Sequence, residues 1–96
     1  MKNVLTTWID GDAIIFALPS HSLKGYGRTL VKCEMLGNDL FVTHECGVTK
    51  SDRNLSCRCT KTAVDAFLSI QPNVTFENVI YETKNITLQP TWEQVK

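Results

Sequence analysis

Four cysteines and one histidine near the middle of this sequence are the residues best suited to chemistry, and that chemistry is metal binding. Cys33, Cys46, Cys57 and Cys59 offer thiols, and His44 offers an imidazole. Zinc prefers four tetrahedral ligands drawn from these two groups. We therefore expect a Zn2+ site formed by the four cysteines, with His44 replacing Cys33 in the alternative set. Four protein ligands leave no position for a substrate, so this zinc would stabilise the fold.

The spacing of these residues supports two pairs of ligands. Residues i and i+2 point the same way in an extended chain, which would direct Cys57 and Cys59 toward one point, and His44 and Cys46 likewise. The spacing differs from the repeated C-x2-C pairs of common zinc sites. Three other interpretations therefore stay open: buried free thiols, disulfides, or a cysteine nucleophile with His44 as its base.

The first element expected to position these residues is a hairpin over residues 4–18. Its strands are rich in β-branched and apolar residues, and Asp10-Gly11 between them is typical of a tight turn. Pro19 should end the second strand, because proline cannot donate a hydrogen bond to a neighbouring strand.

A second hairpin is expected over residues 29–46, with Asn38 and Asp39 as its two central residues. This register places Cys33 opposite His44. It also gathers the apolar residues and the potential ligands on one face, because side chains alternate along a strand. The residues expected on that face are Val31, Cys33, Met35, Leu40, Val42, His44 and Cys46.

A helix should follow the second hairpin, capped by Thr60 or Thr62 and running to about Ile70. Its buried face is marked by apolar residues at the spacing of helical turns: Ala63, Ala66, Phe67 and Ile70. Further strands are expected over residues 74–80 and 85–88. The predicted fold is a single α+β domain over residues 1–96, mostly antiparallel β hairpins with one main helix, stapled by zinc.

Length and composition limit the classes of function. The chain has 96 residues, of which 43% are hydrophobic, and ten Lys+Arg balance ten Asp+Glu. Zero net charge argues against a dedicated nucleic-acid binder, which usually carries a basic surplus. The longest apolar run, residues 13–18, is too short to cross a membrane and does not follow a basic segment as in a secretion signal. We expect a cytoplasmic protein that does not bind membranes.

Binding is therefore the expected activity, and four residues are candidates for contact with a partner. Trp92 lies beyond Pro90 and is expected to be exposed, and tryptophan is enriched at binding hot spots. Arg53, Arg58 and Lys61 could form a basic patch beside the metal loop. These cations keep a zinc-containing nucleic-acid-binding module open as the alternative.

Two resemblances bear on function. Residues 8–16 resemble the opening strand of metal-dependent 5′-nuclease and PIN-type nuclease domains, in which an aspartate at a strand end helps bind divalent cations. A turn explains Asp10 better, because no second acidic pair follows. The chain as a whole resembles, in type and not in any motif, the small phage-encoded anti-CRISPR proteins, some of which contain metal. That resemblance implies a non-enzymatic, stoichiometric inhibitor of a host defence complex, such as an RNA-guided type II effector nuclease.

Overall fold

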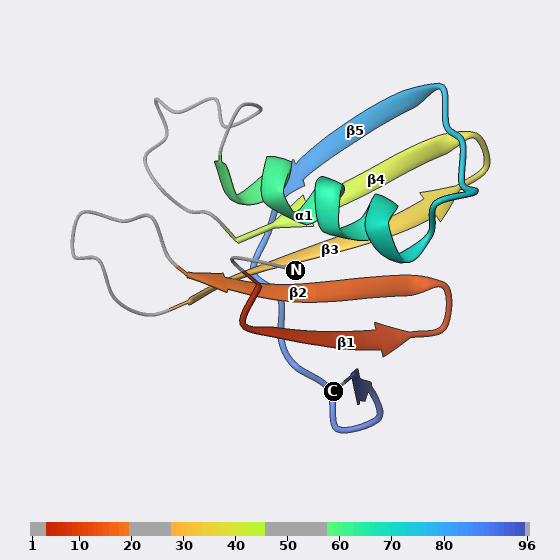
Figure 1. Ribbon diagram of the computed structural model, residues 1–96. Coiled ribbons are helices and arrows are strands. Elements are labelled where there is room, and N and C mark those ends of the chain that lie inside the picture. Colours follow the sequence, from red (N-terminus) through yellow and green to blue (C-terminus); the bar gives the residue numbers. More distant parts are fainter. Residues whose placement is uncertain (1–3, 20–27, 46–57, 96) are drawn as a thin grey trace.

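A computed structural model describes residues 4–19, 28–45 and 58–95, which form one six-stranded sheet and one helix (Figure 1). The elements in chain order are β1 (Thr6–Asp10), β2 (Ala13–Pro19), β3 (Arg28–Leu36), β4 (Asp39–His44), α1 (Arg58–Ile70), β5 (Asn78–Thr83) and β6 (Glu93–Val95). The strand order across the sheet is β5-β4-β3-β2-β1-β6. All neighbouring pairs are antiparallel except β4 and β5, which are parallel. The expected α+β class is confirmed, with a mixed sheet.

The two hairpins form with turns that differ by a residue from those expected. Asp10 pairs with Ala13, so Gly11 and Asp12 are the central residues of the first turn. In the second hairpin Leu36 pairs with Asp39, so the centre is Gly37-Asn38 and not Asn38-Asp39. Both glycines have positive φ, 63° and 65°, which tight hairpin turns require and which glycine adopts without strain.

The second hairpin therefore has a register shifted by two residues from the expected one. Cys33 lies opposite Val42, and His44 lies opposite Val31. A shift of two keeps every side chain on its expected face, because the side-chain period of a strand is two. The shared apolar face was predicted correctly, but the direct pairing of Cys33 with His44 was wrong.

Helix α1 covers one face of the sheet, which we call the helix face (Figure 1). It packs over β2, β3 and β4 and does not reach β5. Ala63, Ala66 and Phe67 are buried there as expected, whereas Ile70 at the last turn is 38% exposed. The helix begins at Arg58, so Thr60 is a buried residue of the first turn and not a cap. The main core lies between this helix and β2, β3 and β4.

The chain between β5 and β6, residues 84–92, forms the second layer of the fold, and we call it the crossover. It passes behind the sheet in Figure 1 and reaches β6 beside β1, on the side away from the helix. Ile86, Leu88 and Trp92 from this crossover pack with Trp8 against a second, smaller core. We call this side of the sheet the crossover face. Its buried members are Ile15, Ala17 and Leu30.

The carboxyl-terminal third differs most from the expected strands. Residues 74–77 are not a strand, although Val74 and Phe76 pack against the main core, and β5 runs instead from Asn78 to Thr83. Residues 85–88 form no strand, and β6 lies beyond Pro90, where none was expected. Within the described ranges, no helix is long and apolar enough to cross a membrane.

Candidate functional site

Cys33 and His44, the two described residues of the predicted metal site, are core residues of the helix face. Cys33 is 0% exposed, and its burial raises the pKa of the thiol to about 12, so the thiol keeps its proton at neutral pH. His44 is 1% exposed, and its Nε2 lies 3.2 Å from the Thr83 hydroxyl. A thiol that keeps its proton is a poor nucleophile. It can still become a zinc ligand, because a bound zinc ion deprotonates the thiols that coordinate it, so Cys33 stays a predicted ligand.

The other predicted zinc ligands lie in or beside a segment that the structure does not describe. Cys46 and Cys57 are outside the described residues, and Cys59 is in the first turn of α1. The expected Cys57-x-Cys59 pair therefore stays a prediction that the described residues do not test. Over residues 4–19, 28–45 and 58–95, no three His, Cys, Asp or Glu side chains gather into a metal site. Zinc stapling of the fold is therefore unsupported by the described residues, and the cofactor stays a prediction.

The predicted partner-binding residues are not brought together by the described structure. Trp92 is half-buried in the crossover and packs against the second core, so it is less exposed than expected. Lys61 is exposed on α1, on the opposite side of the sheet. Arg58 is the first residue of α1, and Arg53 lies outside the described residues. The described residues therefore do not test the basic patch expected from Arg53, Arg58 and Lys61.

Glu45, which the sequence analysis did not single out, fixes the crossover to the sheet. One carboxylate oxygen, Oε2, accepts a hydrogen bond from the Ile86 N–H at 2.8 Å. The other, Oε1, accepts one from the Leu30 N–H at 3.3 Å. The backbone N–H of Glu45 in turn donates to the Leu30 carbonyl at 3.0 Å. Hydrogen bonds to an ionised group are the stronger ones, so this residue helps decide which part of the crossover face is covered.

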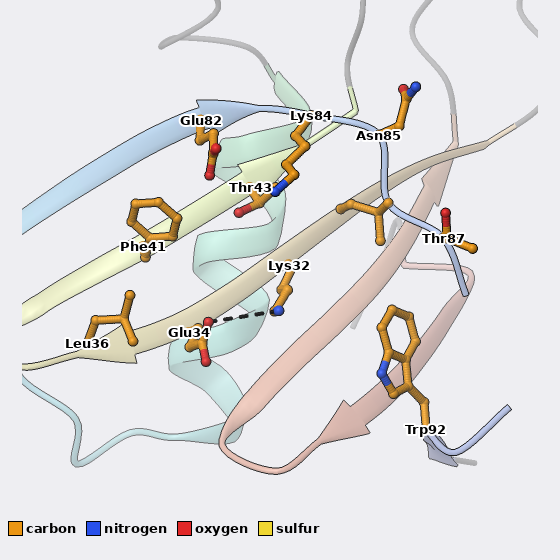
Figure 2. A pocket seen from close by; sticks show the side chains of 11 residues that line it. Lys32, Glu34, Leu36, Phe41, Thr43, Glu82, Lys84, Asn85, Thr87 and Trp92 are labelled. Atoms are coloured by element: carbon orange, nitrogen blue, oxygen red, sulfur yellow. Dashed lines mark ion pairs between the residues drawn. The ribbon is translucent and has the colours of Figure 1, made fainter. Parts of the chain in front are cut away.

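The part of the crossover face that stays uncovered lies over β3, β4 and β5 and holds a shallow open pocket of about 300 Å³. Figure 2 shows its wall, with Leu36 and Phe41 near one end and Trp92 of the crossover at the other. Charged side chains line the middle: Lys32 and Glu34 from β3, Glu82 from β5, and Lys84. Lys32 Nζ lies 3.9 Å from Glu34 Oε1, a loose surface ion pair.

Three apolar side chains on this uncovered area remain accessible to solvent, and we call them the open patch: Leu36, Phe41 and Ile80. Leu36 is 50% exposed, Ile80 is 41% exposed, and Phe41 is half-buried. Phe41 and Ile80 are direct partners in the parallel β4–β5 register, and Glu34 faces Phe41 on the other side. The open patch is thus an apolar surface on a rigid sheet with charges of both signs beside it.

The sequence contains only a weak signal for the open patch. Leu36, Phe41 and Ile80 come from three strands, and each alternates with residues that face the main core. Alternation on a two-sided sheet predicts apolar residues on both faces, but it does not tell which of them a distant segment covers. No family model, no curated protein and no solved structure matches this chain.

Proposed function

We propose that this chain is a protein-binding domain that docks through the open patch and acts as a stoichiometric inhibitor of a larger complex. The observation that carries the proposal is the solvent accessibility of Leu36, Phe41 and Ile80 on one face, where Phe41 and Ile80 are register partners. Contiguous exposed apolar surface with a polar margin is typical of protein–protein interaction sites. The sheet holds these side chains in fixed positions, which lowers the entropy lost on binding.

The charges beside the open patch favour a protein surface over a polyanion. Lys32 and Lys84 are offset by Glu34 and Glu82 around the same pocket. Nucleic-acid sites carry a clear excess of cations, because phosphate contacts supply most of the affinity. A mixed and balanced margin instead suits a partner with charges of both signs. Of the three cations predicted to contact nucleic acid in the alternative, only the side chain of Lys61 is described, and it is exposed.

In its most specific form the proposal takes an RNA-guided type II effector nuclease as the partner, encountered in a host cytoplasm. This form is supported by the resemblance in type to small anti-CRISPR proteins. It requires no catalysis, because a domain that occupies a loading or docking surface inhibits simply by binding.

The test of this form is a titration of DNA cleavage by a purified type II nuclease with its guide. The wild-type chain should stop cleavage at an equimolar ratio. Leu36→Glu should need a large excess, because it places a charge within the open patch. Leu5→Glu is the matched control, since Leu5 is 59% exposed and precedes β1, at the end of the sheet away from the open patch.

Two results would count against the proposal. Full cleavage in the presence of excess wild-type chain would contradict the type II nuclease as partner. Inhibition by Leu36→Glu equal to that of Leu5→Glu would contradict the open patch as the docking surface. Binding of the chain to DNA or RNA that weakens steeply with salt and depends on Lys61 would support the alternative instead.

A further inference from the structure

Strand β5 is an edge strand, and no strand among the described residues pairs with its outer side. Its edge is six residues long and contains no lysine and no proline, two residues that proteins often place on edges to prevent pairing. The opposite edge is different, because β6 has only three residues, all exposed, and begins with Glu93. The edge of β5 is therefore the one suited to adding a further strand.

The outward-facing backbone groups of β5 can be assigned from its pairing with β4. The Lys84 N–H donates to the His44 carbonyl at 2.9 Å, and His44 is the register partner of Thr83. Alternate residues of a strand direct their N–H and C=O groups to the same side. The even-numbered residues of β5 thus face β4, and Val79, Tyr81 and Thr83 offer their N–H and C=O groups outward.

The residues of β5 are complementary to themselves in one antiparallel register, centred on Ile80. In that register Ile80 lies opposite Ile80 of the second copy, Val79 lies opposite Tyr81, and Asn78 lies opposite Glu82. A β-branched residue facing an aromatic one is a favourable cross-strand pair. Asn78 already donates to the Asp39 carboxylate at 3.1 Å, and its amide has a second N–H for Glu82 of the second copy. A register centred on Glu82 would instead place two carboxylates directly opposite each other.

We propose that two copies of this chain associate through antiparallel pairing of their β5 strands, centred on Ile80. The sheet then continues from one protomer into the other, and Phe41 and Ile80 of both copies form a single apolar row across the two-fold axis. The added strand would cover the partly exposed side chains of Ile80, Val79 and Tyr81. Because both crossover faces lie on the same side of such a sheet, the two open patches become continuous. A two-fold axis makes this a closed, isologous interface.

The first test is the mass of the chain in solution over a range of concentrations, measured by light scattering. The wild-type chain should have twice the mass of its 10.8 kDa protomer. Ile80→Lys should halve that mass by placing like charges at the axis. Ile70→Lys, at an exposed isoleucine on α1, should leave it unchanged. A monomeric wild-type chain at every concentration, or a dimeric Ile80→Lys variant, would overturn the proposal.

The second test measures the register by oxidative cross-linking. Ile80 forms a non-hydrogen-bonded pair with itself, in which Cα atoms are about 4.5 Å apart, within the range of a disulfide. Ile80→Cys should form a covalent dimer faster than the wild-type chain, and Asn78→Cys should not. Equal cross-linking of the two variants would overturn the Ile80 register. Leu36→Glu should remain dimeric, which distinguishes failure of this inference from failure of the proposed docking function.

Discussion

The Glu45 carboxylate accepts a hydrogen bond from the backbone N–H of Ile86 at 2.8 Å, joining two residues 41 positions apart in the chain. Because the other carboxylate oxygen accepts from the Leu30 N–H, the side chain fastens the crossover to the start of β3. Ile86 then packs against the second core. This contact covers one half of the crossover face and leaves the open patch accessible on the other half.

We predict that Glu45→Ala lowers the free energy of unfolding by about 2 kcal/mol, the cost of losing two hydrogen bonds to an ionised, partly buried acceptor. Glu45→Gln should lose less, because its amide oxygen still accepts one of the two bonds. Urea denaturation measures both effects, with Glu77→Ala at an exposed glutamate as the control. Equal stability of all three variants would show that the crossover does not depend on Glu45.

Cys33 makes the stability of the fold depend on pH in the alkaline range. The folded state raises the pKa of this thiol from 9.0 to about 12. Its contribution to stability is therefore fully present below pH 9 and is lost as the pH rises toward 12, because only the unfolded state then releases the proton. Cys33→Ala should be less stable than the wild type at pH 8, where it leaves a cavity.

The stability difference between the wild type and Cys33→Ala should then narrow by about 1 kcal/mol between pH 8 and pH 10, since one pKa unit corresponds to about 1.4 kcal/mol. Urea denaturation at the two pH values measures this difference. The titration of the other three cysteines does not affect it, because both proteins contain them. A difference that is constant with pH would contradict a protonated, buried Cys33.

The turn at Gly37 should be sensitive to its backbone conformation and not to crowding. A Cβ at this position meets no atom within 4 Å, but the φ of 65° is one that side chains rarely adopt. We expect Gly37→Ala to cost about 1 kcal/mol and Gly37→Asn to cost less, because asparagine tolerates this conformation better. Thermal unfolding measures the order of the three proteins. A Gly37→Asn variant less stable than Gly37→Ala would contradict the assigned turn.

The zinc prediction keeps both of its ligand sets: Cys33, Cys46, Cys57 and Cys59, or the alternative in which His44 replaces Cys33. The metal content of the folded chain tests zinc binding, and Cys33→Ala separates the two sets. Native mass spectrometry against denaturing mass spectrometry should show one zinc bound per folded chain. Cys57→Ser should lose the metal with either ligand set, whereas Cys33→Ala should lose it with the four-cysteine set and retain it with the set that contains His44. A wild-type chain without metal would show that the zinc prediction is wrong.

Local patterns in the sequence were sufficient for the hairpins and the helix. Alternation in residues 29–46 gave the correct faces of the second hairpin, and the spacing of Ala63, Ala66 and Phe67 gave the helix face. The register was missed by two residues because the positive φ belongs to Gly37, which makes Gly37-Asn38 the centre of the turn. Strand β6 was missed because three exposed residues carry no periodic pattern.

The candidate site depended on long-range relationships that local patterns do not contain. The parallel pairing of β4 with β5 brings Ile80 beside Phe41, and no turn between them specifies it. The Glu45 contact with Ile86 decides which half of a face is covered. The cysteines and His44 suggested a metal site by their chemical type; the structure places Cys33 and His44 in the core, and the ligand roles stay predictions.

The most direct measurement of the central claim compares the proteins captured from a bacterial lysate by three immobilised baits: wild type, Leu36→Glu and Leu5→Glu. Quantitative mass spectrometry should identify a protein retained by the wild type and by Leu5→Glu, and lost with Leu36→Glu. That result would assign protein binding to the open patch. Identical capture by all three baits would contradict the claim that this chain works by binding a partner through Leu36, Phe41 and Ile80.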